Sequence, residues 1–302
     1  MSFVLLVFLA ATWHFWMRRP VGHGPAGPAV ARAAFQRVWS DRPVLLVGLG
    51  DSVTAGFGAR PGYSYFDRLV ANPPDEFPDL LGVNLSAVFP RLRATNLAVS
   101  GSTSSHPVRG QLSKLAPQPA DVFGLVVITT GGNDLLHNYG RTPPSAEAMY
   151  GATREQAGPW IGDFKERLDV LLSTVRGRFP GGCRIFLANI YDPTDGVGDI
   201  QWAGLPRWRE GLELLATYNR LLAEAAGRNA DVHLVDIRSA FLGHGIHANQ
   251  PWRSFHRSAD PHYWFHENLE DPNERGYDAL RRLFLNEMIA VLAGGTNPVS
   301  AP

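Results

Sequence analysis

Residues 44–58 read VLLVGLGDSVTAGFG, an apolar run that ends abruptly in polar residues and glycines. The run is short and rich in branched side chains, which predicts a buried β-strand rather than a helix. Ser52 follows this strand, between Gly50 and Gly56. Open α/β sheets gather their reactive side chains at the carboxyl ends of the strands, and glycine permits the sharp turn that such a position needs. Ser52 is therefore a candidate reactive hydroxyl.

Four further apolar segments have the length and composition of buried strands. They are residues 93–99, 125–130, 184–190 and 232–235. Amphipathic patterns predict helices over residues 161–179, 212–222 and 277–291. Pro159 is expected at the start of the first of these, and Asp271 is expected to cap the last, ahead of Pro272. Apolar strands alternating with helices predict a three-layer α/β/α sandwich around a five-stranded parallel sheet, of the flavodoxin-like type.

The composition excludes several classes of protein. The chain has 302 residues, of which 45% are hydrophobic, so it can form a sizeable core. Lys and Arg number 28, as do Asp and Glu, and this balance gives no reason to expect a nucleic-acid partner. The single cysteine excludes an internal disulfide and a cysteine-built metal site.

The first residues of the chain form a separate apolar segment. Residues 2–17 read SFVLLVFLAATWHFWM and are followed by two arginines. The run is short for a membrane-spanning helix, which needs about 20 residues, and it lacks the basic start of a standard signal peptide. Aromatic residues beside arginines are typical of a membrane interface. We expect an uncleaved membrane segment, with export by a signal peptide as the alternative and the side of the membrane left open.

These segments predict the following organisation of the chain. A membrane segment spans 1–18, a linker with a short helix 19–41, the main domain 42–296 and a tail 297–302.

Three polar loops follow predicted strands, and together they contain the groups that acyl transfer requires. They are residues 50–54 (GDSVT), 100–102 (SGS) and 131–134 (GGND). Ser52 offers a hydroxyl nucleophile. The backbone N–H groups of Ser52 and Gly101 and the side-chain amide of Asn133 could donate to a developing oxyanion, for which fixed neutral donors are suited.

The same loops resemble a known family. GDSVTAG at 50–56, NLAVSGST at 96–103 and GGND at 131–134 resemble the first three blocks of the SGNH (GDSL-type) hydrolases, which are serine esterases, lipases and carbohydrate deacetylases. The resemblance covers roughly residues 42–293. It implies that Ser52 is the nucleophile and that Gly101 and Asn133 complete the oxyanion hole.

The resemblance also implies a class of substrate. It would be a carboxylic ester, namely a lipid, a small acyl ester or an O-acetylated sugar, cleaved without a cofactor or a metal. Carbohydrate O-deacetylation is the alternative activity. A non-catalytic binding module on the same fold is the rival from another class.

The fourth block departs from the family pattern, which is usually Asp-x-x-His followed by Pro-Asn. Here Asp271 stands where the histidine would be. We therefore expect the base upstream: His262 oriented by Asp260, with His266 as the alternative. A histidine suits this duty because its unperturbed pKa of about 6.5 lies near neutrality. The histidine-rich stretch could instead bind zinc, an interpretation that we do not favour.

Overall fold

The centre of the molecule is a sheet of five parallel strands, seen in a computed structural model that describes residues 2–293. The strands are β1 (Val44–Gly50), β2 (Leu92–Asn96), β3 (Phe123–Thr129), β4 (Cys183–Ala188) and β5 (Val232–Val235). Their order in the sheet is β2-β1-β3-β4-β5, and every neighbouring pair is parallel. This order confirms the predicted parallel sheet of flavodoxin type, and all five predicted strands are present.

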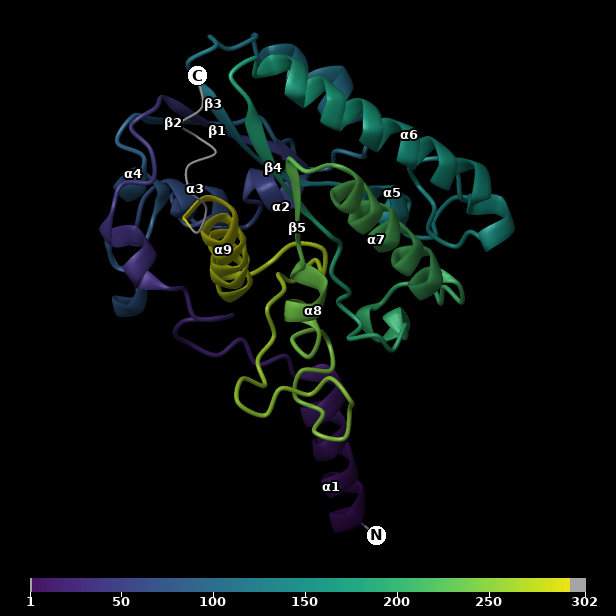
Figure 1. The fold of residues 1–302 in the computed structure, drawn as a ribbon. Coiled ribbons are helices and arrows are strands. Elements are labelled where there is room, and N and C mark those ends of the chain that lie inside the picture. The colour runs from purple at the N-terminus through teal and green to yellow at the C-terminus, as the bar shows by residue number, and fades with distance from the viewer. Residues whose placement is uncertain (1, 294–302) are drawn as a thin grey trace.

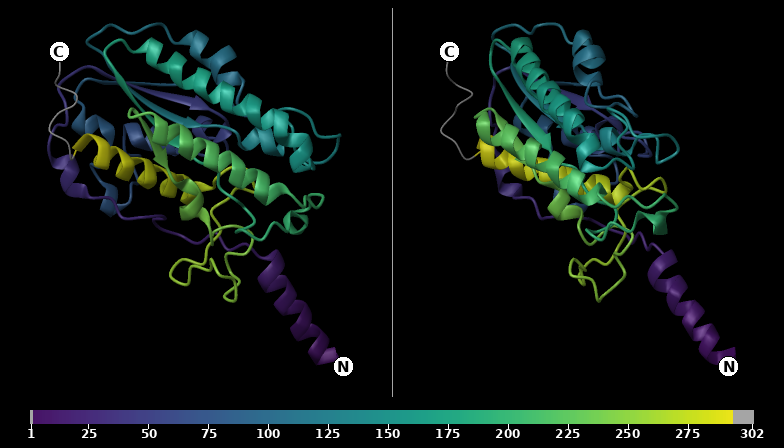
Figure 2. Two further views of the ribbon diagram at one scale, coloured as in Figure 1. Left: turned by 45° about the vertical axis from the view of Figure 1, so that its right-hand side comes forward. Right: turned by 90° about the vertical axis from the view of Figure 1, so that its right-hand side faces the viewer.

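Helices cover both faces of this sheet (Figures 1 and 2). The α-helices of the described residues are α1 (Ser2–Thr12), which does not cover the sheet, α2 (Ser52–Ala55), α3 (Tyr65–Val70), α4 (Leu85–Val88), α5 (Gly132–Leu136), α6 (Arg154–Arg178), α7 (Gly211–Arg228), α8 (Ile237–Phe241) and α9 (Glu274–Met288). Leu46 packs with α3, α4 and α9, whereas its neighbour Leu45 packs with α6 and α7. Successive residues of a strand point to opposite faces, which explains why strands covered on both sides are apolar throughout.

Two predicted helix starts are wrong. The helix α6 is capped by Thr153 in a reciprocal bond pattern with Gln156, and Pro159 lies inside the helix rather than at its start. The cap of α9 is Asn273, whose side chain accepts from the backbone N–H groups of Arg275 and Gly276. Asp271 therefore lies two residues before the cap, and its carboxyl group is not used to start the helix. The predicted end of this helix, at residues 294–295, lies outside the described residues.

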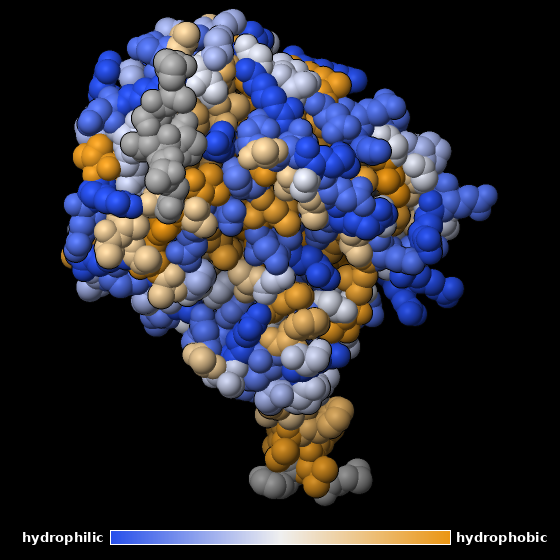
Figure 3. All heavy atoms as spheres, viewed as in Figure 1, coloured by the Kyte–Doolittle hydropathy of each residue, from blue (hydrophilic) through white to orange (hydrophobic). Residues whose placement is uncertain are grey.

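The helix α1 projects from the domain as an apolar rod (Figure 3). Its residues Val4, Leu6 and Phe8 are 73%, 63% and 67% exposed. The aromatic residues that follow pack onto the domain, where the rings of Phe15 and Trp16 contact Trp252. Within residues 2–293, no helix has both the length and the apolar composition required to cross a membrane.

Residues 20–29, expected to be part of a linker, are bonded to the domain. The backbone N–H of Ala26 donates to Asp278 at 2.9 Å, and the Arg275 guanidinium donates to two backbone carbonyls of this segment. A side chain at Gly27 would meet the backbone of Ala279 at 2.8 Å. This segment therefore lies as a strap across α9.

Candidate active site

Ser52 is the first residue of α2, and only Asp51 separates it from β1. The turn depends on Gly50, which has φ +115° and whose Cβ would lie 1.7 Å from the Thr129 carbonyl oxygen. No other residue fits there, because any side chain would collide with the neighbouring strand. Asp51 accepts a hydrogen bond from the backbone N–H of Val53 at 3.2 Å. This local geometry fixes the backbone that carries the Ser52 hydroxyl.

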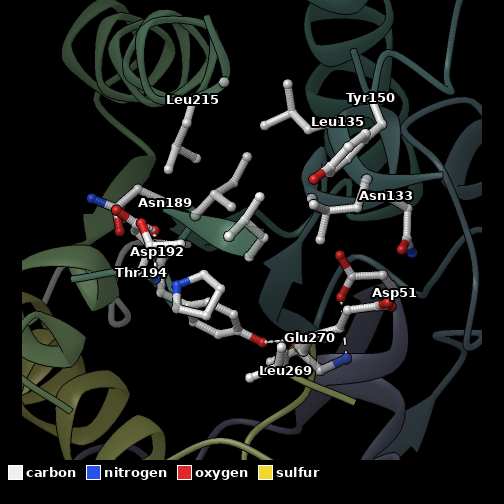
Figure 4. Close-up of a pocket in the computed structure, with 18 of the residues that line it drawn as sticks. Asp51, Asn133, Leu135, Tyr150, Asn189, Asp192, Thr194, Leu215, Leu269 and Glu270 are labelled. Carbon is white, nitrogen blue, oxygen red and sulfur yellow. Dashed lines mark hydrogen bonds between the residues drawn. The ribbon is translucent and has the colours of Figure 1, made fainter. Parts of the chain in front are cut away.

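A pocket of about 980 Å³, including its open mouth, lies at the carboxyl ends of β1, β3 and β4. Ser52 and Asn133 both line it. Figure 4 shows Asp51 and Asn133 on one side of the pocket and Asn189, Asp192 and Thr194 across from them. Much of the wall between is apolar: Leu135, Leu136, Tyr150, Ile190, Ile200, Trp208, Leu212, Leu215, Ile237 and Leu269. The pocket therefore joins a polar end at Ser52 to an extended apolar wall.

The three predicted oxyanion donors come from adjacent loops. The side-chain amide of Asn133 donates to the carbonyl of Ser102 at 2.9 Å, which ties the loop after β3 to the loop after β2. Gly101 lies in this second loop at φ +80°. Of the described residues, Gly101 is not among those that line the pocket, whereas Ser52 and Asn133 are.

Gln111 is a positioning residue that the sequence did not reveal. Its side chain accepts from the backbone N–H of Gly50 at 2.8 Å and donates to the carbonyl of Gly50 at 2.7 Å. It also donates to the Ser102 hydroxyl at 3.2 Å. One amide thus satisfies both backbone groups at the end of β1, where an unpaired buried group would cost free energy. No local pattern around Gln111 predicts this contact, since its partners lie far away in the sequence.

The structure brings Asp260 and His262 together, outside the pocket. His262 Nδ1 is 2.5 Å from one carboxylate oxygen of Asp260, and Arg275 is 2.5 Å from the other. The His262 ring packs against Gly22 of the strap. His266 packs beside Phe57 with ring centroids 5.9 Å apart. Among the described residues that line the pocket with Ser52, neither histidine is present.

Asp271 is a buried acid near the Ser52 hydroxyl, which influences its pKa. It is only 2% exposed, and Asn268 donates to its Oδ2 at 2.7 Å. Burial raises the pKa of the Asp271 carboxyl, while the Ser52 hydroxyl, Asn268 and the nearby His266 act in the opposite direction. Its Oδ1 is buried and has no hydrogen-bond partner in residues 2–293.

The comparisons with known proteins agree with this architecture. Residues 49–279 match the GDSL-like lipase/acylhydrolase family. The chain belongs to this family. The comparison with curated proteins gave no match.

Solved structures similar to this chain include an acetylxylan esterase and an extracellular lipase. A catalytic mutant of an acetylxylan esterase from Geobacillus stearothermophilus is 18% identical, with a TM-score of 0.51 over 82% of this chain and 96% of that chain. An extracellular lipase from Streptomyces rimosus is 17% identical, with a TM-score of 0.50 over 81% of this chain and 99% of that chain. At these identities the similarity shows a shared fold.

Histidines that were considered as zinc ligands contact different acids. Within residues 2–293, no three His, Cys, Asp or Glu side chains are grouped as a metal site requires. His262 contacts Asp260, and His247 contacts Asp199 at 2.7 Å. These histidines belong to separate pairs.

Asp51 is the second buried acid beside Ser52. Burial raises its pKa from 3.8 to about 7, and the negative charge of Asp271 acts in the same direction. The Thr129 hydroxyl donates to it at 2.6 Å and opposes the shift. Because the pKa is raised in the folded state, the stability linked to this group is complete in acid and is lost as the pH rises through about 7.

We expect Asp51→Asn to increase the free energy of unfolding more at pH 8 than at pH 5. Oδ1 of Asp51 accepts both the Val53 and the Thr129 hydrogen bonds, and an asparagine oxygen can keep them. At 1.36 kcal/mol per pKa unit, the ionised carboxylate costs on the order of 4 kcal/mol at pH 8 and less at pH 5. Urea unfolding at the two pH values measures the difference. An equal change at both would contradict the raised pKa.

Proposed function

We propose that this protein is a serine hydrolase of carboxylic esters with Ser52 as its nucleophile. The observation that carries the proposal is that Ser52 and Asn133 open onto one pocket in a chain of the GDSL-like family. Ser52 Oγ bonds to the ester carbonyl carbon, and the alcohol leaves with a proton. Water then attacks the acyl-enzyme, which releases the acid and restores the Ser52 hydroxyl.

The negative charge that forms on the carbonyl oxygen needs donors that are already in place. The Asn133 amide is held by the Ser102 carbonyl and lies in the same pocket as Ser52. The backbone N–H groups of Ser52 and Gly101 are the other proposed donors, with Gly101 one residue from that anchoring carbonyl. Asp134, next to Asn133, accepts from the Ser104 backbone N–H at 2.8 Å and so supports the arrangement of the two loops.

The apolar wall supports an acyl chain longer than acetyl as the part of the substrate that the pocket holds. Leu135, Leu212 and Leu215 line the wall from α5 and α7. Burial of apolar surface contributes about 0.8 kcal/mol for each methylene removed from water. An O-acetylated sugar is the second candidate substrate, supported by the shared fold of the acetylxylan esterase.

The experiment that tests this function is a series of p-nitrophenyl esters from acetate to dodecanoate. We expect kcat/KM to rise by roughly fourfold for each added methylene, up to about eight carbons. Leu212→Trp should shorten the pocket and abolish the preference for longer chains while acetate turnover persists. Leu81→Trp is the matched control, because Leu81 is 49% exposed and does not line the pocket. Highest activity on p-nitrophenyl acetate would favour an O-acetylated sugar as the substrate. Absence of hydrolysis of every ester in the series would contradict the proposal.

We further propose that α1 attaches the protein to a membrane surface, since its apolar side chains lie exposed. The full chain should sediment with lipid vesicles, and deletion of residues 2–12 should abolish sedimentation without changing Tm. Deletion of residues 2–29 should lower Tm as well, because it removes the strap contacts with Asp278 and Arg275. Equal sedimentation of the full chain and the shorter deletion would contradict attachment through α1.

A further inference from the structure

We propose that Asp271 is the general base for Ser52 and that Asn268 positions it, in place of a histidine and its acid. This inference rests on the proposed ester hydrolysis. The residues 268–273 read NLEDPN, in which Asn268 and Asp271 have the spacing of the family's Asp-x-x-His, followed by the same Pro-Asn. Both members of the pair are exchanged together: the base position holds an acid, and the acid position holds a neutral amide.

The contacts of Asp271 leave one of its carboxylate oxygens without a hydrogen bond in the described part of the chain. Asn268 donates its amide to Oδ2 at 2.7 Å, and its own side-chain oxygen accepts from the Asp271 backbone N–H at 3.2 Å. The Asp271 carbonyl accepts from the His266 backbone N–H at 2.7 Å, which fixes the loop on the other side. Oδ1 is buried and has no hydrogen-bond partner within residues 2–293. The Ser52 hydroxyl is near enough to Asp271 to lower the pKa of its carboxyl.

The exchange of both residues is chemically consistent. A histidine base is oriented by an acid that accepts its N–H and stabilises the imidazolium. A carboxylate base already carries the negative charge, and a second acid behind it would repel that charge. An amide that donates a hydrogen bond orients the carboxylate and stabilises its charged form. Asn268 in contact with Asp271 supplies this donor.

The position of the loop also supports this role. Leu269 and Glu270, the two residues before Asp271, line the pocket together with Ser52. Figure 4 shows both beside Asp51, at the polar end of the pocket. The loop is held by Tyr191, whose hydroxyl donates to the Glu270 carbonyl, and by the isolated bridge between Phe265 and Pro272. These contacts fix the loop that carries Asp271 at the edge of the pocket that Ser52 lines.

In each half of the reaction, one proton passes through the Asp271 carboxylate. As Ser52 Oγ bonds to the ester carbon, its proton passes to the Asp271 carboxylate, and the protonated acid then gives it to the departing alkoxide. In the second half, Asp271 accepts a proton from the attacking water. The acyl–Oγ bond breaks, and that proton returns to Ser52. The carboxylate is regenerated after each half, so no further reactant is needed besides water.

Several ionisable groups surround Asp271 and set its charge. They are Asp51, Tyr139, Tyr191, His266, Glu270 and Tyr277. Burial dominates and raises the pKa of Asp271 above the ordinary carboxyl value of 3.8. Because a base acts only when deprotonated, kcat/KM should fall as the pH falls through this pKa. Loss of the Asn268 donor should raise the pKa further and move this decline to higher pH.

The test compares Asp271→Asn, His262→Ala and His266→Gln in the full chain, with p-nitrophenyl ester turnover and fluorophosphonate labelling as readouts. Asp271→Asn should lower kcat by about 10³-fold, slow the labelling of Ser52 and leave Tm nearly unchanged, because the amide has the shape of the carboxyl. The two histidine variants should lose less than about tenfold. His266→Gln is the most important control. The Nδ1 atom of the His266 ring is buried and has no hydrogen-bond partner among residues 2–293, so it is the alternative base that the test has to exclude.

A second variant separates a base from a structural residue. Asn268→Ala should move the acidic decline of kcat/KM to higher pH while KM changes little, which a purely structural role would not produce. If the wild type hydrolyses esters but Asp271→Asn retains its turnover, or His266→Gln loses as much as Asp271→Asn was expected to lose, Asp271 is not the base. If the wild type neither hydrolyses esters nor labels at Ser52, the proposed function and this inference both fall.

Discussion

Ser52→Ala should lower the turnover of p-nitrophenyl esters by on the order of 10⁴-fold or more, because removal of a nucleophile abolishes the covalent route. The stability of the fold should not change with this loss of turnover. The sharp turn into α2 depends on Gly50 and on the Asp51 cap, and neither needs the Ser52 hydroxyl. Thermal unfolding of both proteins measures stability beside the kinetics.

Covalent labelling gives an independent measurement of the same residue. A fluorophosphonate probe should label the wild type at Ser52, shown by peptide mass spectrometry, and should not label Ser52→Ala. Ser173→Ala, an exposed serine on α6, is the matched control and should behave as the wild type. Turnover that survives in purified Ser52→Ala would rule out this nucleophile, and absence of labelling in an active wild type would do the same.

Asn133→Ala should lower kcat by about 10²–10³-fold with KM little changed, since an oxyanion donor acts mainly in the transition state. The donor is fixed before the reaction by its contact with the Ser102 carbonyl, so it does not have to reorient as the charge develops. Steady-state kinetics with the best p-nitrophenyl ester separate the two parameters.

The control for Asn133 must also lose an amide-to-carbonyl hydrogen bond. Asn286→Ala does so on α9, where Asn286 donates to the Ala29 carbonyl at 3.0 Å, away from the pocket. It should leave kcat unchanged. A large rise in KM with intact kcat in Asn133→Ala would mean that Asn133 binds the ground state of the substrate instead of stabilising the transition state.

The fold could be predicted from the sequence because its signals are local. Strands buried on both faces need continuous apolar runs, and Leu45, Leu46 and Val47 in β1 are fully consistent with this requirement. The location of the loops that carry Ser52 and Asn133 can also be predicted from the strands, because parallel strands end at one edge of the sheet. These two residues do line one pocket.

The environment of the nucleophile could not be predicted in the same way. Asp271 and Asn273 both precede α9 and both have side chains that cap helices, so composition alone gave the cap to the wrong residue. The helix begins after Asn273, so the Asp271 carboxyl does not cap it and instead accepts from Asn268, near the Ser52 hydroxyl. The predicted Asp260–His262 pair does form, but its distance from the pocket depends on contacts between remote segments, which no local pattern encodes.

The strap across α9 gives the domain a defined orientation relative to α1. A domain joined to its N-terminal helix by a free Gly/Pro tether would tumble and present its active site in every direction. Here the linker is held by contacts along its length. The Phe15 and Trp16 rings contact Trp252, and the segment of residues 20–29 is bonded to the domain, so α1 has little freedom to move relative to it. Any surface that holds α1 would therefore also determine the direction in which the mouth of the pocket opens, and so from which side an ester can enter.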